Sequence, residues 1–159
     1  MTILAVLTIP SLENFYSLTK ARVLQSQLLQ EIDYAREAAY DRRLSVGLCP
    51  SGNQHTCTDN WMEGKLVFID EEDKQILKVI PPIFNQGYLH FRAYPAYLSY
   101  LLFLPRGFSQ ENGSFWYCIS RNSTPSWAII LNQSGRARVQ YPDSSGVIKD
   151  AQGKKLLCN

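Results

Sequence analysis

The first third of the chain carries a helical pattern that is longer than a small domain is deep. No Gly or Pro occurs in residues 11–46. Apolar residues recur there at steps of about three and four, at Leu12, Tyr16, Val23, Leu24, Leu28, Ile32, Ala35 and Ala39. A helix over residues 3–45 would be about 65 Å long at the α-helical rise per residue. We therefore expect its first half to project from the rest of the protein.

The chain starts with an almost wholly apolar run, Met1–Leu12. This run is shorter than the roughly 20 residues that cross a bilayer. It also differs from a secretory signal, because no Lys or Arg precedes Lys20 and no small-residue cleavage site follows. We interpret it as the latter half of a longer membrane segment. Pro10 should kink the helix, and Gly47 and Pro50 should end it.

Beyond residue 47 the sequence changes to short apolar runs separated by turns, which is typical of strands. The expected strands are Lys65–Asp70, Gln75–Ile80, Gly87–Tyr94, Tyr97–Leu104, Ser114–Ser120, Trp127–Leu131 and Arg136–Tyr141. The acidic cluster Asp70–Asp73 is expected to form a hairpin loop. The sequence thus predicts an α+β protein, with a helical segment over residues 1–46 and a β-rich head domain over residues 47–159.

The four cysteines indicate disulfides. Their spacing lacks the close pairs of a structural zinc site, and an even count in turn-rich segments suits two disulfides in an oxidising compartment. Four cysteines allow three pairings. We favour Cys49–Cys57, which closes a short loop, and Cys118–Cys158, which ties the chain end to a strand. The alternative is a cytosolic protein with four reduced, buried thiols.

The positive charge is concentrated near the C-terminus. Residues 1–133 hold 11 Lys and Arg against 12 Asp and Glu, a net charge of −1. Residues 134–159 hold five basic residues against two acidic ones, a net charge of +3. A local cationic patch attracts phosphate or another anionic surface. An ordinary solvated surface is the alternative.

Catalytic signals are weak throughout the sequence. Ser17 and Lys20 match S-x-x-K, but they lie on the helix without the partner motifs of a nucleophilic serine. His55 and His90 are the only histidines, and neither lies in a metalloprotease motif. We predict no catalytic residue, no metal site and no cofactor, and therefore a structural and binding subunit rather than an enzyme.

Three groups of residues, taken together and in order, resemble the FimT/GspH family of minor type IV pilins and pseudopilins. The first is the apolar-Pro-amphipathic helix. The second is Leu48-Cys49-Pro50 followed by Cys57, Trp61, Gly64 and Leu66–Asp70. The third is Phe103-Leu104-Pro105-Arg106-Gly107, then Cys118, then Ser134–Val139. The resemblance implies a helix that spans the bacterial inner membrane and later packs in a filament core. It also implies that the second half of this helix lies on an antiparallel, β-sandwich-like domain.

A basic hairpin is the main candidate site. Asn132–Gly135 is a plausible turn, and in a following strand Arg136 and Arg138 would share the solvent face while Ala137, Val139 and Tyr141 face the core. Arginine forks grip phosphate oxygens in bidentate fashion. In the FimT branch, a Gly-Arg-x-Arg motif is associated with DNA binding in natural transformation, and Gly135, Arg136 and Arg138 match it. Lys149, Lys154 and Lys155 could join the same surface.

The resemblance therefore implies a minor pilin on the periplasmic side of the inner membrane and then in a pilus at the cell surface. Its partners would be other major and minor pilins, and DNA bound through phosphates with little sequence specificity. Single- and double-stranded DNA both remain candidate ligands. The alternative is a structural minor pilin or pseudopilin that primes assembly of a type IV pilus or a type II secretion filament without binding DNA.

Overall fold

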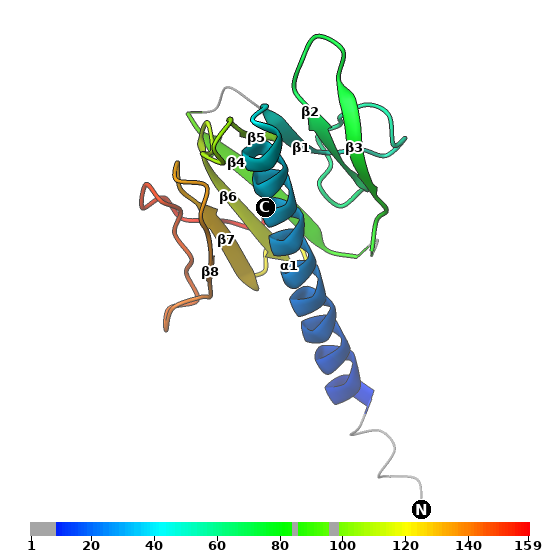
Figure 1. Cartoon of the computed structure of the whole chain (residues 1–159). Coiled ribbons are helices and arrows are strands. Elements are labelled where there is room, and N and C mark those ends of the chain that lie inside the picture. Colours follow the sequence, from blue (N-terminus) through cyan, green and yellow to red (C-terminus); the bar gives the residue numbers. More distant parts are fainter. Residues whose placement is uncertain (1–8, 84–85, 96–98) are drawn as a thin grey trace, which may run out of the picture.

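The computed structural model of the chain describes residues 9–83, 86–95 and 99–159, with side chains of the helix described from residue 15 onward. One long helix, α1 (Ile9–Arg42), crosses the head and projects from it at its N-terminal end (Figure 1). The helix ends three residues earlier than expected, because Arg43 adopts a left-handed φ of 56°. Pro10 lies in the first turn of the described helix, and the kink predicted there depends on residues 1–8, which lie outside the described residues.

One face of α1 is buried from Ala21 onward. Its core side chains recur at steps of three and four: Ala21, Leu24, Leu28, Ile32, Ala35 and Ala39. They pack against apolar residues from both sheets in one core cluster. Val23 and Tyr16, which the sequence pattern placed on this face, are exposed. Val23 lies one position off the buried stripe, and Tyr16 precedes the part of the helix that covers the head.

The first antiparallel sheet has the strand order β3-β2-β1-β5. Its strands are β1 (Val46–Pro50), β2 (Lys65–Ile69), β3 (Gln75–Ile80) and β5 (Leu101–Phe103). The acidic run Asp70–Asp73 connects β2 to β3, which confirms the predicted hairpin loop. The predicted strand Tyr97–Leu104 is shorter in the structure, and its residues 97–98 lie outside the described residues.

Strand β1 was missed in the sequence, because Gly47 and Pro50 indicated only the end of a helix. Both residues lie inside this central strand. At Gly47 the ring of Phe68 from the paired strand β2 occupies the space of a side chain, so an added Cβ would overlap it. Glycine is therefore required here for close packing between neighbouring strands, which explains why a helix-breaking residue occurs in a strand.

The second antiparallel sheet has the strand order β4-β6-β7-β8. Its strands are β4 (Tyr88–Tyr94), β6 (Asn112–Cys118), β7 (Trp127–Leu131) and β8 (Ala137–Gln140). Each overlaps an expected strand and differs from it by at most two residues at either end. Tyr141 falls outside β8 and is 59% exposed, although it was expected in the core. Its hydroxyl instead hydrogen-bonds the side chain of Gln25 on α1, at 3.1 Å.

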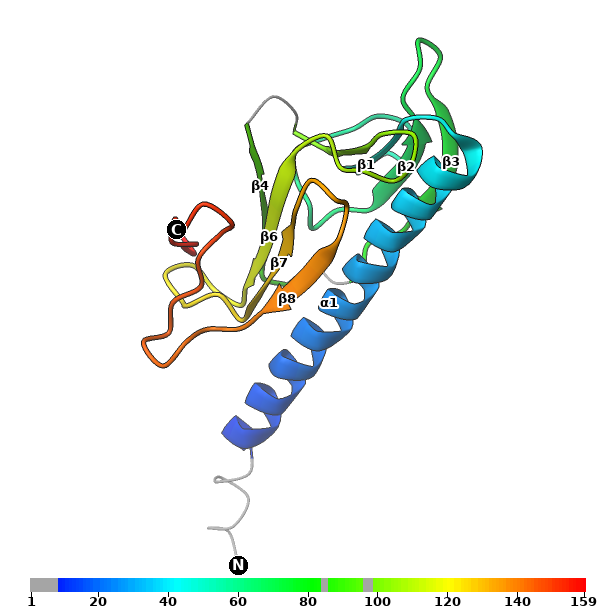
Figure 2. The same ribbon diagram turned by 60° about the vertical axis from the view of Figure 1, so that its left-hand side comes forward.

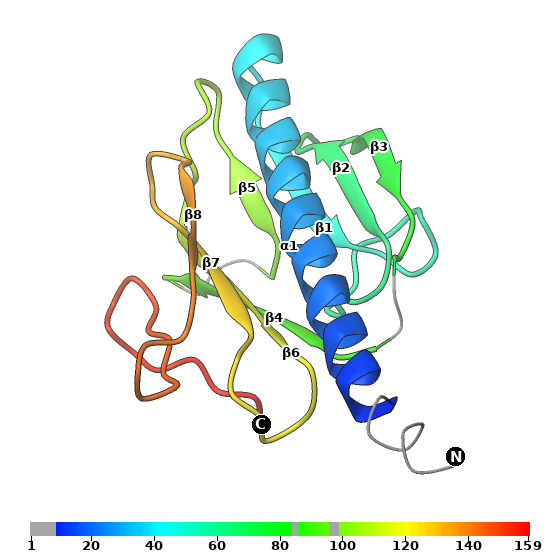
Figure 3. The same cartoon turned by 90° about the horizontal axis from the view of Figure 1, so that it is seen from below.

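The two sheets lie against the same side of α1, with β1, β2 and β3 beyond one flank of the helix and β7 and β8 beyond the other (Figure 3). The indole of Trp127 on β7 donates a hydrogen bond to the Ala21 carbonyl of α1, at 2.8 Å. On the other sheet, Lys65 of β2 forms an ion pair with Glu31 of α1, with nitrogen and oxygen 3.3 Å apart. The helix thus fastens both sheets, which confirms the predicted α+β class.

Among the described residues, no helix combines the length and the hydropathy that crossing a bilayer requires. Most of the predicted membrane segment, Met1–Leu12, precedes the described residues.

Candidate functional site

The turn between β7 and β8 is organised by the side chain of Asn132. Its Oδ1 accepts hydrogen bonds from the Arg136 N–H at 3.2 Å and from the Ser134 hydroxyl at 2.6 Å. The Gly135 N–H donates to the Asn132 carbonyl at 2.9 Å. Asparagine commonly stabilises turns in this way, by replacing backbone hydrogen bonds with side-chain ones. The residues at the start of β8 are therefore held in a defined conformation.

Gly135 lies at the point where this turn meets the β5–β6 loop. Its φ is 76°, it is buried, and an added Cβ would overlap the carbonyl oxygen of Gly107. The guanidinium of Arg36 on α1 donates to the Gly135 carbonyl at 3.4 Å. Gly135 was predicted from the sequence to be part of the Gly-Arg-x-Arg motif associated with DNA binding. In the structure the approaching backbone belongs to Gly107, so Gly135 positions the turn.

Arg136 and Arg138 are both exposed. Arg138 lies opposite Ile130 of β7, on the sheet face turned away from α1, whereas Val139 lies opposite Ile129 and packs towards the helix. In the part of the chain that the structure describes, the two ion pairs are Glu31–Lys65 and Arg92–Asp150. Neither arginine of the hairpin is thus neutralised by a described carboxylate, and both guanidinium groups face water.

The C-terminal segment covers the face of the second sheet from which Arg138 projects. Ile148, Leu156 and Cys158 are buried there against Trp116 and Ile130. The disulfide Cys118–Cys158 fastens the end of the chain to β6, with the two Cα atoms 5.7 Å apart. The free movement of the tail is therefore restricted, and its exposed groups keep a fixed relation to the sheet.

The three lysines of this tail are exposed. Lys149 and Lys155 face each other across a short antiparallel bridge, and Lys154 precedes that bridge. Between them Asp150 turns inward: it pairs with Arg92 and accepts the backbone N–H groups of Gln152 and Lys154. The lysines consequently form a second cationic group on the same side of the sheet as Arg138, while Arg136 lies in the turn at the end of the hairpin.

Two further cations lie beside the hairpin that the sequence did not indicate. Arg36 reaches from α1 to the Gly135 carbonyl, and Arg106 is exposed in the β5–β6 loop. That loop is joined to the hairpin by a hydrogen bond from the Ser109 N–H to the Gln133 carbonyl, at 3.1 Å. Arg36 falls in an ordinary helical pattern and Arg106 in a turn motif, so only the packing of helix, loop and hairpin brings them together.

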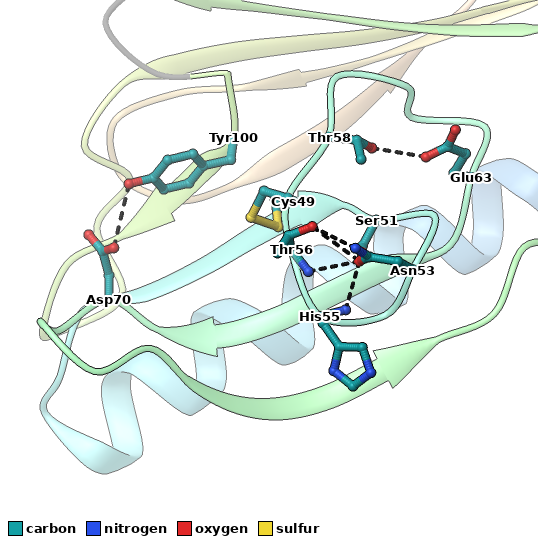
Figure 4. The surroundings of a disulfide bond; sticks show 10 residues. Cys49, Ser51, Asn53, His55, Thr56, Thr58, Glu63, Asp70 and Tyr100 are labelled. Atoms are coloured by element: carbon teal, nitrogen blue, oxygen red, sulfur yellow. Dashed lines mark hydrogen bonds between the residues drawn. A yellow bond between two sulfur atoms is a disulfide. The ribbon is translucent and has the colours of Figure 1, made fainter.

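The second disulfide, Cys49–Cys57, closes the loop after β1, with Cα atoms 5.6 Å apart (Figure 4). Inside this loop Asn53 Oδ1 accepts the N–H groups of His55 and Thr56, both at 2.9 Å. Residues 51–64 contain no Lys or Arg. Both disulfides are the pairs favoured from the sequence, and Cys118–Cys158 is the one that holds the segment with the tail lysines.

Tyr100 lies near the same loop and hydrogen-bonds Asp70 through its hydroxyl, at 3.5 Å (Figure 4). Burial, together with the negative charge of Asp70, raises the pKa of the Tyr100 hydroxyl above its ordinary value. The phenol is therefore neutral at physiological pH. It contributes a hydrogen-bond donor rather than a charge to this side of the head.

Comparison with known proteins gives one family and one fold. The family model described as Type II transport protein GspH matches residues 25–135. A crystal structure of the type IV minor pilin FimU from Pseudomonas aeruginosa strain PAO1, in space group P21, has a TM-score of 0.60 and 18% sequence identity. The structural match covers 82% of this chain and 94% of the FimU chain. A second crystal form, P65, has a TM-score of 0.55, 16% identity, and coverage of 72% and 88%. No curated protein matches by sequence.

Proposed function

The chain belongs to the GspH family, and we propose on this basis that it is a FimT-like minor pilin that binds extracellular DNA and assists its uptake in natural transformation. The apolar run Met1–Leu12 would lie in the bacterial inner membrane before assembly. It would later pack, together with the projecting half of α1, in the filament core among other major and minor pilins. The head would lie on the periplasmic side and then at the surface of a type IV pilus.

The observation that carries the DNA proposal is the pair of solvent-facing arginines on a fixed hairpin. Arg138 lies in β8 and Arg136 directly precedes this strand. Residues two apart in an extended chain are separated by about 6.6–6.8 Å, so both guanidinium groups can reach neighbouring phosphates. The Asn132 turn and the contact with Gly107 hold the hairpin in place before any ligand arrives. Little ordering entropy would then be lost on binding.

The tail lysines would add a weaker, long-range attraction. Lys149, Lys154 and Lys155 are exposed on a segment that the disulfide holds against the sheet. Such charges raise the local concentration of a polyanion without reading its sequence. Because few phosphates are contacted by one copy, the affinity of a single head should be modest and strongly dependent on salt.

The test is a titration of the full chain, kept in mild detergent, with labelled duplex DNA at several salt concentrations. The variant Arg136→Gln/Arg138→Gln should bind more weakly. Its log–log salt slope should fall by roughly 0.9 for each lost phosphate contact. The matched control is Lys74→Gln/Lys78→Gln, which removes the same charge from exposed positions at β3 and beside it.

Binding equal to wild type in the arginine variant would reject the hairpin as the DNA site. An equal loss in the lysine control would mean that net charge alone accounts for binding. If the wild-type chain binds no DNA at any salt concentration, the DNA proposal fails as a whole.

A second candidate function is favoured by the exposed apolar residues on the projecting half of α1. Phe15, Tyr16 and Leu18 are all exposed there, which is costly unless another subunit covers them. A structural minor pilin or pseudopilin that primes filament assembly would use this surface. A deletion strain scored separately for piliation and for transformation distinguishes the two: loss of transformation with normal piliation supports DNA uptake, and loss of pili supports assembly.

A further inference from the structure

A groove adjoins the basic hairpin at the end of the head where α1 stops. We call it the distal groove; its volume is about 820 Å³, and it is lined by Tyr40, Asp41, Arg43, Pro105, Arg106 and Phe108. One wall belongs to the end of α1 and the other to the β5–β6 loop, which lie side by side in Figure 2. The groove is thus formed only when helix and loop are packed together.

The distal groove and the hairpin form one continuous surface. The loop that carries Arg106 and Phe108 contacts Gly135 through the Gly107 backbone. Ser109 extends the same loop into a hydrogen bond with the Gln133 carbonyl. Arg36 lies beneath this junction, with its side chain against both glycines. A strand of nucleic acid on Arg136 and Arg138 could therefore continue into the groove without crossing a gap in the protein.

Two aromatic rings line the groove and remain open to water. Tyr40 is 65% exposed and Phe108 is 51% exposed, and they come from the two opposite walls. Exposed aromatic rings in a basic groove are the feature by which proteins bind single-stranded nucleic acid, because every base offers a flat face for stacking. A ring that packs in the core is buried, as Phe103 is in the neighbouring strand.

The charge of the groove suits the backbone of the same ligand. Arg43 and Arg106 are exposed on its two walls, and Asp41 is the one carboxylate among the six lining residues. Two further exposed arginines lie next in sequence to these elements: Arg42 precedes Arg43 at the end of α1, and Arg136 follows the glycine that approaches the β5–β6 loop. Arginine also stacks on aromatic planes, so these side chains can hold phosphates and flank bases together.

We propose that the distal groove binds unpaired nucleotides, with bases stacked on Tyr40 and Phe108 and phosphates held by Arg43 and Arg106. This inference rests on the proposed DNA function and narrows it to a preference for single-stranded DNA. In a duplex the base faces are covered by their neighbours in the stack, so the two rings gain nothing from it. The hairpin arginines contact phosphates of either form.

The experiment compares fluorescence anisotropy of the full chain with labelled oligothymidylate and with a duplex carrying the same number of phosphates. Wild type should bind the single strand more tightly. Tyr40→Leu/Phe108→Leu should weaken single-strand binding on the order of tenfold for each lost ring and leave duplex binding unchanged. Tyr40→Phe keeps the ring and should bind the single strand as wild type does.

The matched control is Tyr16→Leu, a tyrosine on the same helix that is 61% exposed and lies about 36 Å along the helix axis from Tyr40. It should change neither affinity. Because Tyr40 and Phe108 are exposed, the variants should fold, and thermal melts followed by circular dichroism verify this.

Single-strand binding that is unchanged in Tyr40→Leu/Phe108→Leu, or reduced equally for both ligands, overturns the inference. So does a change confined to self-association in sedimentation, because the groove would then bind protein. If Tyr40→Leu/Phe108→Leu binds single-stranded DNA as wild type does, while Arg136→Gln/Arg138→Gln loses duplex binding, the proposed function stands and this inference alone fails. A wild-type chain that binds neither ligand removes both.

Discussion

At the scale of single residues, two glycines control how the hairpin meets its support. Gly107 and Gly135 both have left-handed φ values, 75° and 76°, and their backbones lie in contact. A side chain at either position would adopt a strained conformation. At Gly135 its Cβ would also overlap the Gly107 carbonyl oxygen, and at Gly107 it would crowd the Arg36 side chain. The close packing of the β7–β8 turn against the β5–β6 loop therefore requires residues without a Cβ.

We predict that Gly135→Ala destabilises the head by more than the conformational cost alone. Gly153→Ala is the matched control, since Gly153 has a φ of 81° but nothing within 4 Å of an added Cβ. The control should lose about 1 kcal/mol of unfolding free energy from its strained φ. Gly135→Ala should lose clearly more, because the Gly107 carbonyl must also move. Urea unfolding measures both, and equal losses would show that the contact with Gly107 is unimportant.

At the scale of elements, α1 and β2 are joined by a buried ion pair. The side chains of Glu31 and Lys65 are 4% and 3% exposed, and Gln27 donates a further hydrogen bond to Glu31 at 3.0 Å. Two charges taken out of water gain little over an apolar pair, but a lone buried charge is costly. The pair consequently fixes how helix and strand align more than it adds to stability.

Removing one partner should therefore cost far more than removing both. We expect Glu31→Ala to lower the unfolding free energy by about 3–5 kcal/mol, because the Lys65 ammonium remains buried without its partner. The double variant Glu31→Met/Lys65→Met should be close to wild type or more stable. Chemical denaturation of the three proteins measures this, and a double variant as unstable as the single one would contradict it.

The elements show how far local patterns reach. The helix has a clear apolar periodicity, and the seven expected strands are short runs between turns. All of these strands except β5, which begins four residues late, lie within two residues of their expected bounds. The eighth strand, β1, was missed because its residues Gly47 and Pro50 are both helix terminators in isolation. Only the Phe68 ring of a strand some twenty residues later explains the glycine. A local sequence pattern was enough to predict the other strands, whereas β1 depends on a contact between segments that are distant in the sequence.

At the scale of the whole molecule, the two disulfides close loops of very different length. Their sequence separations are 8 residues for Cys49–Cys57 and 40 residues for Cys118–Cys158. The longer loop contains β7, β8 and the tail lysines. Its cross-link therefore restricts most of the cationic part of the chain in the unfolded state.

We predict that Cys118→Ala/Cys158→Ala destabilises the protein more than Cys49→Ala/Cys57→Ala does. Loop-closure entropy gives about 4 kcal/mol for the longer loop and about 2.5 kcal/mol for the shorter one. Urea unfolding of the two double variants provides the comparison, with hydrogen exchange at Lys149–Leu156 as a second readout. A larger loss in the Cys49/Cys57 variant would contradict the prediction.

The candidate site, too, could be predicted only where its residues lie close together in the sequence. Arg136 and Arg138 were predicted from a four-residue motif and from alternation along an expected strand. In the structure Arg138 lies in β8, whereas Arg136 precedes the strand in the turn. Arg36, Arg106 and the rings of Tyr40 and Phe108 were not predicted. They come from two separate segments, α1 and the β5–β6 loop. No periodicity within either segment indicates that the two converge with the β7–β8 turn.

The direction of α1 determines how far the β7–β8 turn lies from the projecting half of the helix. The helix is about 51 Å long from Ile9 to Arg42, and its projecting half lies opposite the end that carries the β7–β8 turn. A partner that binds the projecting half of α1 therefore leaves the β7–β8 turn, with Arg136, exposed at the opposite end. Because α1 is one continuous helix packed on the head, the head moves with it. A molecule bound at the hairpin would be displaced by the same distance as the helix.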